Sequence, residues 1–587
     1  MSRISLRWSV VLLVLAFQSF CLLRHDLGHG AGFTHSYGYN AAWILEFDNT
    51  LAQGHFPPRW LHGAWDGMGA SSFYFYPPLA FYVAAFVRYA FGTIDHAMIL
   101  AWANYLMVLG SGVAMFAWLR SRVGDAWALV GALVYVAAPY HLLGVYVRGS
   151  IGETAAYMTL PLLALCLERA ARSWAWIPGM ALSLAALIMS HLLIGMLVCV
   201  TVMPAYAVHL LLDTPKAQRR DTLLRCAAGV ALGLAVAASY LGPALLMQKL
   251  ALLRVMWGND ADPYNWALMT PGRWPQKPFS TSMAWLAYGM AGAALAALVA
   301  IAGRALSSPR REALAWSVGV LVAFTLYALP WPWHGFTGQF LGKVQFPYRL
   351  LLGMEFAAVT AIILAAAHGR RLALAVLLVA AALPLSRGFS MQKDAIGFHL
   401  LQPGDPAMPE LARQIACHFA PMEHLPADFA GGPRYVVDPY CMTGFAKMPL
   451  AGVQDDGAQT GGAKVTAANV FPDGSVAIAV EAVHPARIVL RKYYFPTWRI
   501  ERVEKGRDPA VKAELSLPDG LLSFVAEPGS HTYRARIIRS PLEIACDTLT
   551  LSALALIAAW LGLSLYRRLN ARGLLASFRA FMRIRTR

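Results

Sequence analysis

The strongest constraint in this sequence is a succession of long apolar runs separated by short clusters of arginine and lysine. A helix needs roughly 20 apolar residues to cross about 30 Å of hydrocarbon, and many of these runs approach that length. The composition agrees, since 58% of the 587 residues are hydrophobic and 14% are charged, with a mean hydropathy of +0.49. Soluble domains are usually about 45–50% apolar and about 25% charged. The sequence therefore predicts a polytopic α-helical membrane protein.

The net charge of +17 would by itself suit a nucleic-acid-binding protein. Its distribution argues against that class, because the basic residues lie in short clusters between the apolar runs. Cytoplasmic loops of membrane proteins carry this excess of lysine and arginine. The lipid bilayer is therefore an expected partner, and nucleic acid is not.

Placing every basic cluster on the cytoplasmic side gives one consistent threading of about twelve spans. The predicted spans cover residues 8–24, 96–119, 125–140, 153–168, 175–190, 193–212, 223–242, 283–303, 313–330, 347–367, 371–386 and 546–566. The first run has no small-x-small cleavage site directly after it, and the residue before Cys21 is the large Phe20. It is therefore expected to be an uncleaved first span.

Residues 387–544 differ in kind from the rest of the chain. Turn signals reading PDG separate strand-like runs at 475–482, 486–495, 521–527 and 532–539, which predicts a small antiparallel β domain on the outer side. Cys417 and Cys441 fall in this oxidising location and are candidates for a disulfide.

The chain is thus predicted to consist of three parts. A transmembrane domain covers 1–386 and has a long first outer loop at 25–95. The β-rich domain covers 387–544, in the periplasm if the cell is Gram-negative. The last span and a basic tail with seven arginines cover 545–587, and the tail suits a helix lying on anionic lipid.

The first outer loop begins with a stretch at 41–54 that reads AAWILEFDNTLAQG. Polar side chains recur there at helical spacing opposite an apolar stripe: Glu46, Asn49, Thr50 and Gln53. This pattern predicts a helix in the membrane interface with one wet face.

A second interfacial helix is predicted at 76–92, where Tyr76 precedes two prolines. Between the two helices lie Arg59, within a Pro-Pro-Arg-Trp stretch, and a glycine-rich turn around Asp66. A plain aromatic belt with satisfied charges is the alternative interpretation.

Several stretches resemble the GT-C glycosyltransferases and, more closely, the bacterial family labelled 6-pyruvoyl-tetrahydropterin synthase-related membrane proteins. They read EFDNTLAQGHFPPRW (46–60), GMGASSFYFYPPLAFY (67–82), APYHLLGVYVRGSIGE (138–153), SH (190–191) and VQFPYRLL (344–351), with weaker likeness at EHLP (423–426) and YYFPTW (493–498). Each stretch is short, but their order and spacing make the resemblance fairly specific. The family label is not an activity.

The resemblance implies a first span, a long outer loop with two interfacial helices, and an acidic catalytic residue early in that loop. This chain departs from the pattern, because GFTHSYGYN around His35 and Ser36 contains no acid. Either another acid takes the role, or transfer activity is altered or absent.

A GT-C enzyme would transfer a sugar with inversion from a polyprenyl-phosphate donor to an envelope glycan, lipid or protein, here outside the bacterial inner membrane. A carboxylate would deprotonate the acceptor hydroxyl, and cations would hold the departing phosphate. Several relatives use a divalent metal, which keeps a metal cofactor open. No metal-ligand cluster stands out, and the seven cysteines show no metal-ligand spacing.

The candidate bases under this hypothesis are Asp48 and Asp66, followed by Glu46. Asp48 lies two positions after Glu46, so the two side chains point to different sides of the helix. The alternative for each is a surface or capping carboxylate.

The candidate phosphate clamps are Arg59, Arg148 and Arg349, for which membrane snorkelling or ion pairing is the alternative. Glu153 would be costly near hydrocarbon unless it is paired. His191 lies between the fifth and sixth spans, where a hydrogen-bonded helix-end histidine is more usual than a catalyst. Glu153, His191 and Tyr76 are candidate substrate-binding residues beside the three arginines.

Two other classes stay open beside the enzyme. A lipid-linked-glycan transporter or flippase would show ionisable residues in mid-span and paired broken helices. A non-catalytic envelope assembly factor would keep the fold without the base, as the missing acid near Ser36 suggests.

Overall fold

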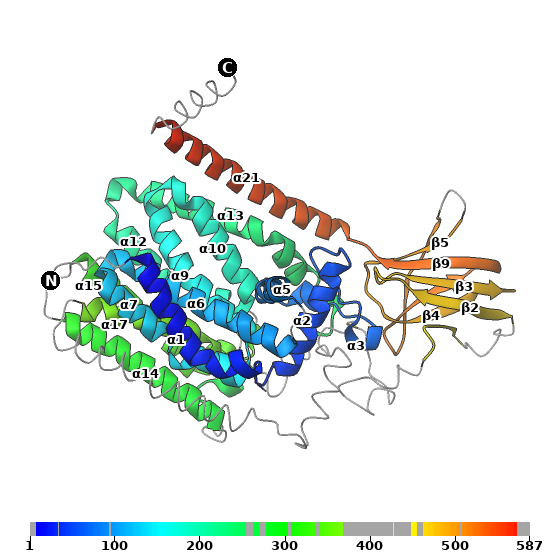
Figure 1. Cartoon of the computed structure of the whole chain (residues 1–587), viewed down its shortest axis with the longest axis horizontal. Helices are drawn as coiled ribbons and strands as arrows, with labels where there is room; N and C mark the ends of the chain where they lie inside the picture. The colour runs from blue at the N-terminus through cyan, green and yellow to red at the C-terminus, as the bar shows by residue number, and fades with distance from the viewer. Residues whose placement is uncertain are drawn as a thin grey trace.

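The computed structural model describes residues 7–367, 427 and 448–571, apart from gaps at 33, 93–94, 254–261, 271–277, 303–306, 335–337, 339–340, 455–461 and 505–507. A bundle of long helices makes up most of the described chain, and a β-rich region projects from one end of it (Figure 1). The predicted fold class, a polytopic helical bundle with a β-rich domain, is confirmed.

Nine segments of the described chain are long and apolar enough to cross a membrane. They are α1 (Trp8–His29), α6 (His96–Val123), the segment Asp125–Arg148 made of α7 (Asp125–Val136), α8 (Pro139–Leu143) and the π-helix η1 (Gly144–Arg148), α9 (Ile151–Arg172), Lys216–Leu246 with α13 (Arg219–Leu246), Thr281–Ile301 within α14 (Pro278–Ile301), α15 (Ser308–Ala328), Pro347–Ala366 with α17 (Leu350–Ala366), and Pro541–Arg567 within α21 (Pro541–Ala571). Each of the nine coincides with a predicted span.

The other predicted spans have different outcomes. The fifth is a shorter apolar helix, Trp174–Ser190, which includes α10 (Ile177–Ser190). The sixth is a pair, α11 (Leu192–Val200) and α12 (Val202–Asp213), bent by 46° at Thr201, whose backbone is not helical. The predicted span at 371–386, the boundary at 386–387, the Cys417–Cys441 pair and the tail beyond residue 571 lie outside the described residues.

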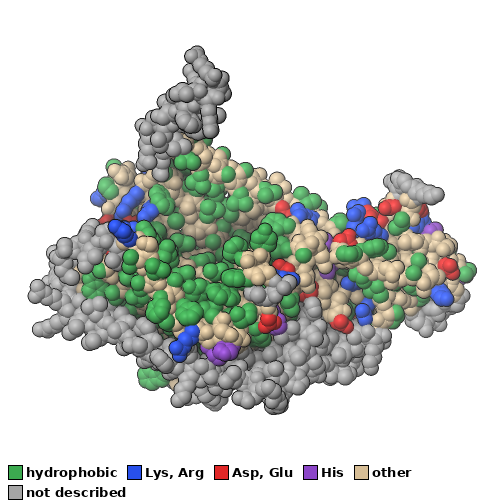
Figure 2. Space-filling model, viewed as in Figure 1, with side chains coloured by type: hydrophobic (Ala, Val, Ile, Leu, Met, Phe, Trp, Pro, Cys, Tyr) green, Lys and Arg blue, Asp and Glu red, His purple; other side chains and the backbone are tan. Residues whose placement is uncertain are grey.

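Burial differs strongly between the helices. In α17 every residue except Ile362 is buried, so this helix lies at the centre of the bundle. By contrast, α21 packs along α13 and exposes leucines such as Leu551 and Leu563. Figure 2 shows hydrophobic side chains over the helical part, with charged ones gathered toward its ends and on the β-rich region. A surface in contact with lipid requires this distribution.

The first outer loop contains four helices: α2 (Tyr37–Ala52), α3 (Ala64–Gly67), α4 (Ser72–Phe75) and α5 (Leu79–Phe91). Helices α2 and α5 correspond to the two predicted interfacial helices. The wet face predicted for α2 is only partly right, because Glu46 and Thr50 are buried while Asn49 and Gln53 are exposed. The following turn folds back over α2, so the Gly63 N–H donates to Glu46 Oε2 at 2.8 Å.

The β-rich region is a two-layered sandwich of antiparallel strands. One sheet has the order β1-β4-β8-β7 and the other β2-β3-β9-β5-β6. The strands are β1 (Ala451–Val453), β2 (Ala463–Val470), β3 (Val476–Ala482), β4 (Ala486–Tyr493), β5 (Trp498–Arg502), β6 (Ala510–Val511), β7 (Glu514–Ser516), β8 (Leu521–Ala526) and β9 (Gly529–Ile537). The two layers pack against each other at Phe524 and Tyr533, whose ring centroids lie 4.7 Å apart. Alternating buried positions in β3 are what a half-buried strand requires.

The sandwich is docked on the first outer loop. The Tyr493 N–H donates to Met68 O at 2.9 Å, and the Lys492 ammonium group donates to Gly67 O. The Trp60 ring lies 5.6 Å from Phe495, and both belong to a hydrophobic cluster shared by loop and sandwich. The sandwich, the loop and the neighbouring helix ends therefore form one packed unit.

Candidate functional site

A cavity of about 610 Å³ lies where the first outer loop meets the beginnings of α9, α11 and α17. The loop contributes residues from His35 to Trp43 and the segment Phe75–Pro77. The other walls come from Arg148 and Ser150, from the start of α11, from the end of α13, and from residues between Lys343 and Arg349. A cavity of this size fits a small-molecule or headgroup ligand.

The start of the loop is fixed to η1 by backbone hydrogen bonds. His35 N–H donates to Val147 O at 3.0 Å, and Ser36 N–H donates to Arg148 O at 3.1 Å. The Asn40 side chain also donates to Gly149 O at 2.6 Å. Gly149 has φ +61°, and a Cβ atom there would lie 1.9 Å from the Thr34 hydroxyl oxygen. Only glycine fits this junction without a shift of the loop.

Three cationic side chains are among the residues that line the cavity. Arg148 ends η1, Lys343 lies in η9 (Gly342–Val344), and Arg349 ends η10 (Pro347–Arg349). Arg349 Nη1 donates to Val344 O at 2.6 Å and to Gln345 Oε1 at 3.1 Å, which fixes its position. Fixed cations at a cavity wall favour an anionic ligand group.

Glu153, which is 1% exposed, is the buried counter-ion of this wall. One oxygen accepts from Arg148 Nη1 and from the Tyr140 hydroxyl at 3.0 Å. The other oxygen lies 3.8 Å from Arg349 Nε. We refer to Arg148, Glu153 and Arg349 as the cavity cluster. One carboxylate faces two guanidinium groups, so the cavity cluster keeps a net positive charge.

His191 and Tyr76, two of the candidate substrate-binding residues, also line the cavity, and their binding role stays a prediction. His191 Nδ1 accepts from Ile194 N at 3.4 Å and so begins α11, while its Nε2 lies 3.8 Å from Glu153. This is the helix-end role expected for His191. Tyr76 packs edge-on against Trp43 with ring centroids 4.6 Å apart. Burial raises the pKa of Tyr76 to about 12, so its hydroxyl stays protonated at neutral pH.

Aromatic rings line the cavity beside these cations, since the Arg148 guanidinium lies 5.0 Å from the Tyr348 ring centroid and the Arg349 guanidinium 5.3 Å from the Phe346 ring centroid. Trp43 and Tyr76 come from the loop, and Phe346 and Tyr348 stack with centroids 5.2 Å apart at 16°. The Tyr240 hydroxyl of α13 donates to Phe75 O at 3.0 Å and holds the loop segment against the bundle. Flat rings beside fixed cations suit a ligand that combines an anion with an apolar or sugar surface.

The three carboxylates predicted as bases lie elsewhere. Glu46 is buried and accepts from Gly63 N, and Asp48 pairs with Arg88 of α5 at 2.7 Å. Asp66 is exposed on a turn in which Trp65 and Asp66 both have left-handed φ values. None of the residues lining the cavity in the described part of the chain is Asp or Glu.

Arg59, predicted as a phosphate clamp, also lies away from the cavity. It is 6% exposed and forms ion pairs with Glu543 and Asp547 of α21. Four of the predicted binding residues thus line the cavity: Tyr76, Arg148, His191 and Arg349. Glu153 lies directly behind them, whereas Arg59 does not line the cavity.

Sequence reasoning missed Lys343 and His35 as lining residues. Lys343 immediately precedes the VQFPYRLL stretch, so its neighbourhood was a usable signal. His35 lies in the stretch GFTHSYGYN, where only the lack of an acid is notable in the sequence. Within the described residues, no three metal-ligating side chains lie together, so these residues by themselves offer no metal site.

Comparisons with known proteins place the chain in a family. No curated protein matches it. A solved structure, ArnT from Cupriavidus metallidurans bound to undecaprenyl phosphate, is similar over 60% of this chain and 77% of that chain, at 15% identity and a TM-score of 0.31. This likeness is too weak to transfer a function. The model of the 6-pyruvoyl-tetrahydropterin synthase related domain, described as a membrane protein, matches residues 73–392. This match spans more than half of the chain, which therefore belongs to the 6-pyruvoyl-tetrahydropterin synthase-related family of membrane proteins.

Proposed function

We propose that this membrane protein is a glycosyltransferase that takes a sugar from a polyprenyl-phosphate-linked donor. The acceptor would be an envelope glycan, lipid or protein. The observation that supports this best is the convergence of Arg148, Lys343 and Arg349 on one cavity with an aromatic wall. The cations suit the phosphate, the rings suit the sugar, and apolar residues such as Leu192 and Leu193 suit the first isoprene units.

The charge of the cavity fits the departing group better than the donor. A polyprenyl-phosphate sugar is a phosphodiester with one negative charge, and transfer leaves a phosphate monoester with close to two. Cations placed where this charge develops lower the barrier. The surplus of the cavity cluster, together with Lys343, supplies such cations without a metal ion.

The reaction needs one proton acceptor. As the acceptor oxygen bonds to the anomeric carbon, the bond from that carbon to the phosphate oxygen breaks, and the hydroxyl proton must leave. We assign this proton to the His35 imidazole, which lines the cavity. Burial, and secondly Arg148, lowers the pKa of His35, so its neutral form predominates at pH 7.

The proposal places the reaction on the outer face of the bacterial inner membrane, with the β-sandwich in the periplasm. This orientation follows from the basic clusters, since lysine and arginine are retained in cytoplasmic loops. The docked sandwich would help to hold the acceptor beside the first outer loop.

A non-catalytic assembly factor is the second candidate function. It is favoured by one observation, that no carboxylate lines the cavity among the described residues. Such a protein would bind the lipid-linked glycan and would not break its glycosidic bond.

A lipid-linked-glycan transporter is the third candidate. The bent pair α11–α12 resembles the broken helices of transporters. Glu355 is also buried inside α17, but it accepts from Tyr140 N at 3.0 Å, His141 N at 3.1 Å and the Tyr157 hydroxyl at 2.6 Å. These hydrogen bonds make Glu355 a fixed internal cap for α8, which weakens the transporter interpretation.

The first experiment is mass spectrometry of envelope glycolipids and glycans from a deletion strain and its complemented parent. Loss of a discrete sugar mass, with build-up of the lipid-linked donor, would support transfer and identify the sugar. A lower amount of a whole glycan with no missing sugar would support transport or assembly and would contradict the proposal.

The second experiment tests the base with purified protein in nanodiscs. His35→Gln is expected to lower the rate of transfer about 10²–10⁴-fold while binding of polyprenyl monophosphate is retained. In the wild type, the neutral imidazole is required, so transfer should fall as the pH drops through a pKa below 6.5 and level off above it.

Two further variants decide between His35 and the carboxylates predicted from the sequence. Asp48→Asn and Asp66→Asn are measured in the same assay. Loss of transfer in either variant, with His35→Gln still active, would assign the base to that carboxylate instead.

A further inference from the structure

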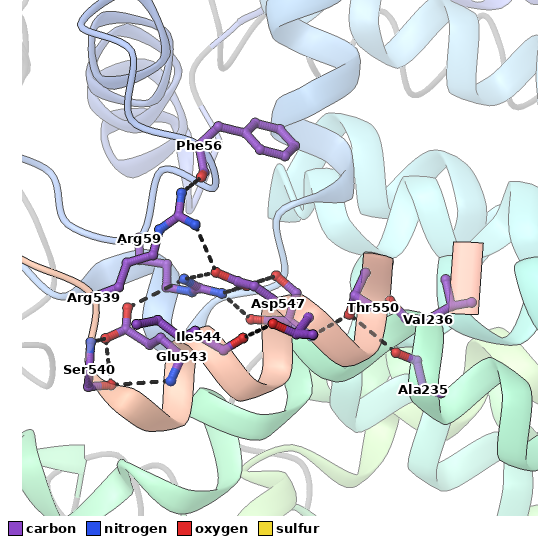
Figure 3. A network of polar contacts seen from close by, with 12 residues as sticks. Phe56, Arg59, Ala235, Val236, Arg539, Ser540, Glu543, Ile544, Asp547 and Thr550 are labelled. Atoms are coloured by element: carbon purple, nitrogen blue, oxygen red, sulfur yellow. Dashed lines mark hydrogen bonds and ion pairs between the residues drawn. The ribbon is translucent and has the colours of Figure 1, made fainter. Parts of the chain in front are cut away.

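A second buried ion-pair cluster joins the first outer loop to α21 (Figure 3). Arg59 Nη1 donates to Glu543 Oε1 at 3.4 Å and to Asp547 Oδ2 at 3.3 Å, and Nη2 donates to the other oxygen of Asp547. Arg59 Nη2 also reaches α13, where it donates to Ser239 O at 2.7 Å and to the Ser239 hydroxyl at 3.0 Å. We call these four residues the outer latch.

The latch lies where the β-sandwich continues into α21. Only three residues separate the end of β9 from the start of α21. Ser540 and Glu543 form a capping box there, with Ser540 N–H and hydroxyl donating to Glu543 Oε2 at 2.9 and 2.8 Å. Arg539 donates to Phe56 O and lies 3.5 Å from Asp547 (Figure 3). The loop, the sandwich and α21 are thus tied at one point.

The latch is connected to the cavity by two short routes. Ser239 directly precedes Tyr240, which lines the cavity and holds Phe75 O. On the loop side, the Phe73 N–H donates to the Arg59 carbonyl at 3.1 Å, two residues before the lining residue Phe75. Arg59 is thus linked to the lining residues Phe75 and Tyr240 through directly bonded neighbours.

We propose that Arg59 is a positioning residue, which holds the Phe75–Tyr76 wall of the cavity in its binding conformation by fastening the loop to Ser239, Glu543 and Asp547. Arg59 touches no ligand in this role. The inference is based on the proposed function, because it takes the cavity to be the site for a phosphate-bearing lipid. This role also gives α21 a function in the site, because α21 supplies Glu543 and Asp547.

The directions of the hydrogen bonds at Arg59 favour a positioning role over a non-directional attraction between charges. A planar guanidinium group bonds α13 and α21 at once, and Ser239 Oγ completes the arrangement by donating to Asp547 at 2.7 Å. Lysine has the charge but not the fork, so it cannot make these directional contacts together. Arg59→Lys therefore keeps most of the electrostatics and removes the geometry.

The test uses the full-length protein in nanodiscs with two readouts. The first is hydrogen exchange in the segment 71–77, at the backbone N–H groups of residues 71–76, which needs no ligand. The second is the affinity for polyprenyl monophosphate. Arg59→Lys is the main variant, and Ser239→Ala is a milder one that keeps the ion pairs. Arg487→Lys is the matched control, because Arg487 pairs with Glu514 at 2.7 Å on the sandwich, away from the cavity.

Arg59→Lys is expected to speed exchange at residues 71–77 and to weaken binding about 2–30-fold. Ser239→Ala should move both readouts in the same direction by less, and Arg487→Lys should move neither. Wild-type affinity and exchange in a folded Arg59→Lys protein would overturn the inference, as would exchange that rises equally in all helices. If the wild type itself fails to bind polyprenyl monophosphate, the proposed function fails, and exchange at 71–77 still decides the positioning role.

Discussion

The cavity cluster and the outer latch contain the same chemistry in opposite proportions. In the cavity cluster, two arginines share one buried carboxylate. In the latch, one arginine faces two carboxylates and a serine. The cavity cluster keeps a positive surplus beside an open volume, whereas the positive charge of the latch is fully matched within the protein. Both clusters contain arginine, so they differ in their balance of charge. A positive surplus suits a wall that binds an anion, and a matched charge suits a structural contact.

The largest effect is expected on stability, when the buried carboxylate of the cavity cluster loses its closest cation. Arg148→Gln leaves the buried Glu153 with guanidinium and imidazole groups only at 3.8 Å. Removing one partner of a buried pair costs about 3–5 kcal/mol in the free energy of unfolding. The double variant Arg148→Gln/Glu153→Gln should recover most of this loss, because no buried carboxylate is then left without its close cationic partner.

This prediction is checked by denaturation with SDS in micelles, followed by helical circular dichroism. The control is Arg487→Gln on the sandwich, which breaks a partly exposed ion pair and should change stability by at most about 1 kcal/mol. Equal stability of the Arg148→Gln and double variants would mean that Glu153 is not held as a buried anion.

A smaller effect, on affinity alone, is expected for Arg349→Gln. Arg349 lies beyond hydrogen-bond distance of Glu153, so the protein should remain folded. Losing a hydrogen bond from a charged donor to phosphate costs about 1.5–3 kcal/mol, or roughly 10–150-fold in affinity. Titration of the nanodisc-embedded protein with polyprenyl monophosphate measures this change. Unchanged affinity would show that the phosphate does not bind at the cavity cluster.

The sequence was sufficient for the fold because each span carries its own signal. Length, apolarity and flanking arginines predicted α6, α9 and α17 without knowledge of their neighbours. The alternating strands β3 and β9 were likewise local patterns. The pairing of β3 with β9 could not be predicted in this way, because the two strands are far apart in the chain and no turn joins them.

The candidate site could be predicted only in part, since it depends on contacts between distant segments. Arg59 and Arg349 look alike in sequence, each beside proline and aromatic residues. They differ because Asp547, 488 positions after Arg59, pairs with it in the fold. Glu46 looked like a wet-face acid because nothing local reveals that the turn at Gly63 folds over it.

The smallest effect on affinity is expected from a disulfide engineered next to the latch. This disulfide distinguishes between two ways in which the latch could act. A Cβ atom added at Gly242 of α13 would lie 3.4 Å from the Cβ of Cys546 on α21. Disulfides have about 3.5–4.5 Å between these atoms, so Gly242→Cys should cross-link to Cys546 after only a slight shift. Because the two helices already touch there, affinity for polyprenyl monophosphate should change by less than about 2-fold.

The informative experiment combines Gly242→Cys with Asp547→Asn in one protein. The control carries Cys546→Ser as well and cannot form the cross-link. If the latch acts by keeping α21 on α13, oxidation should restore the affinity lost in Asp547→Asn, and reductant should remove it again. If it acts by holding the first loop through Arg59, the cross-link should form on a non-reducing gel without restoring affinity. Absence of the cross-link under oxidant would contradict the α13–α21 packing on which both alternatives depend.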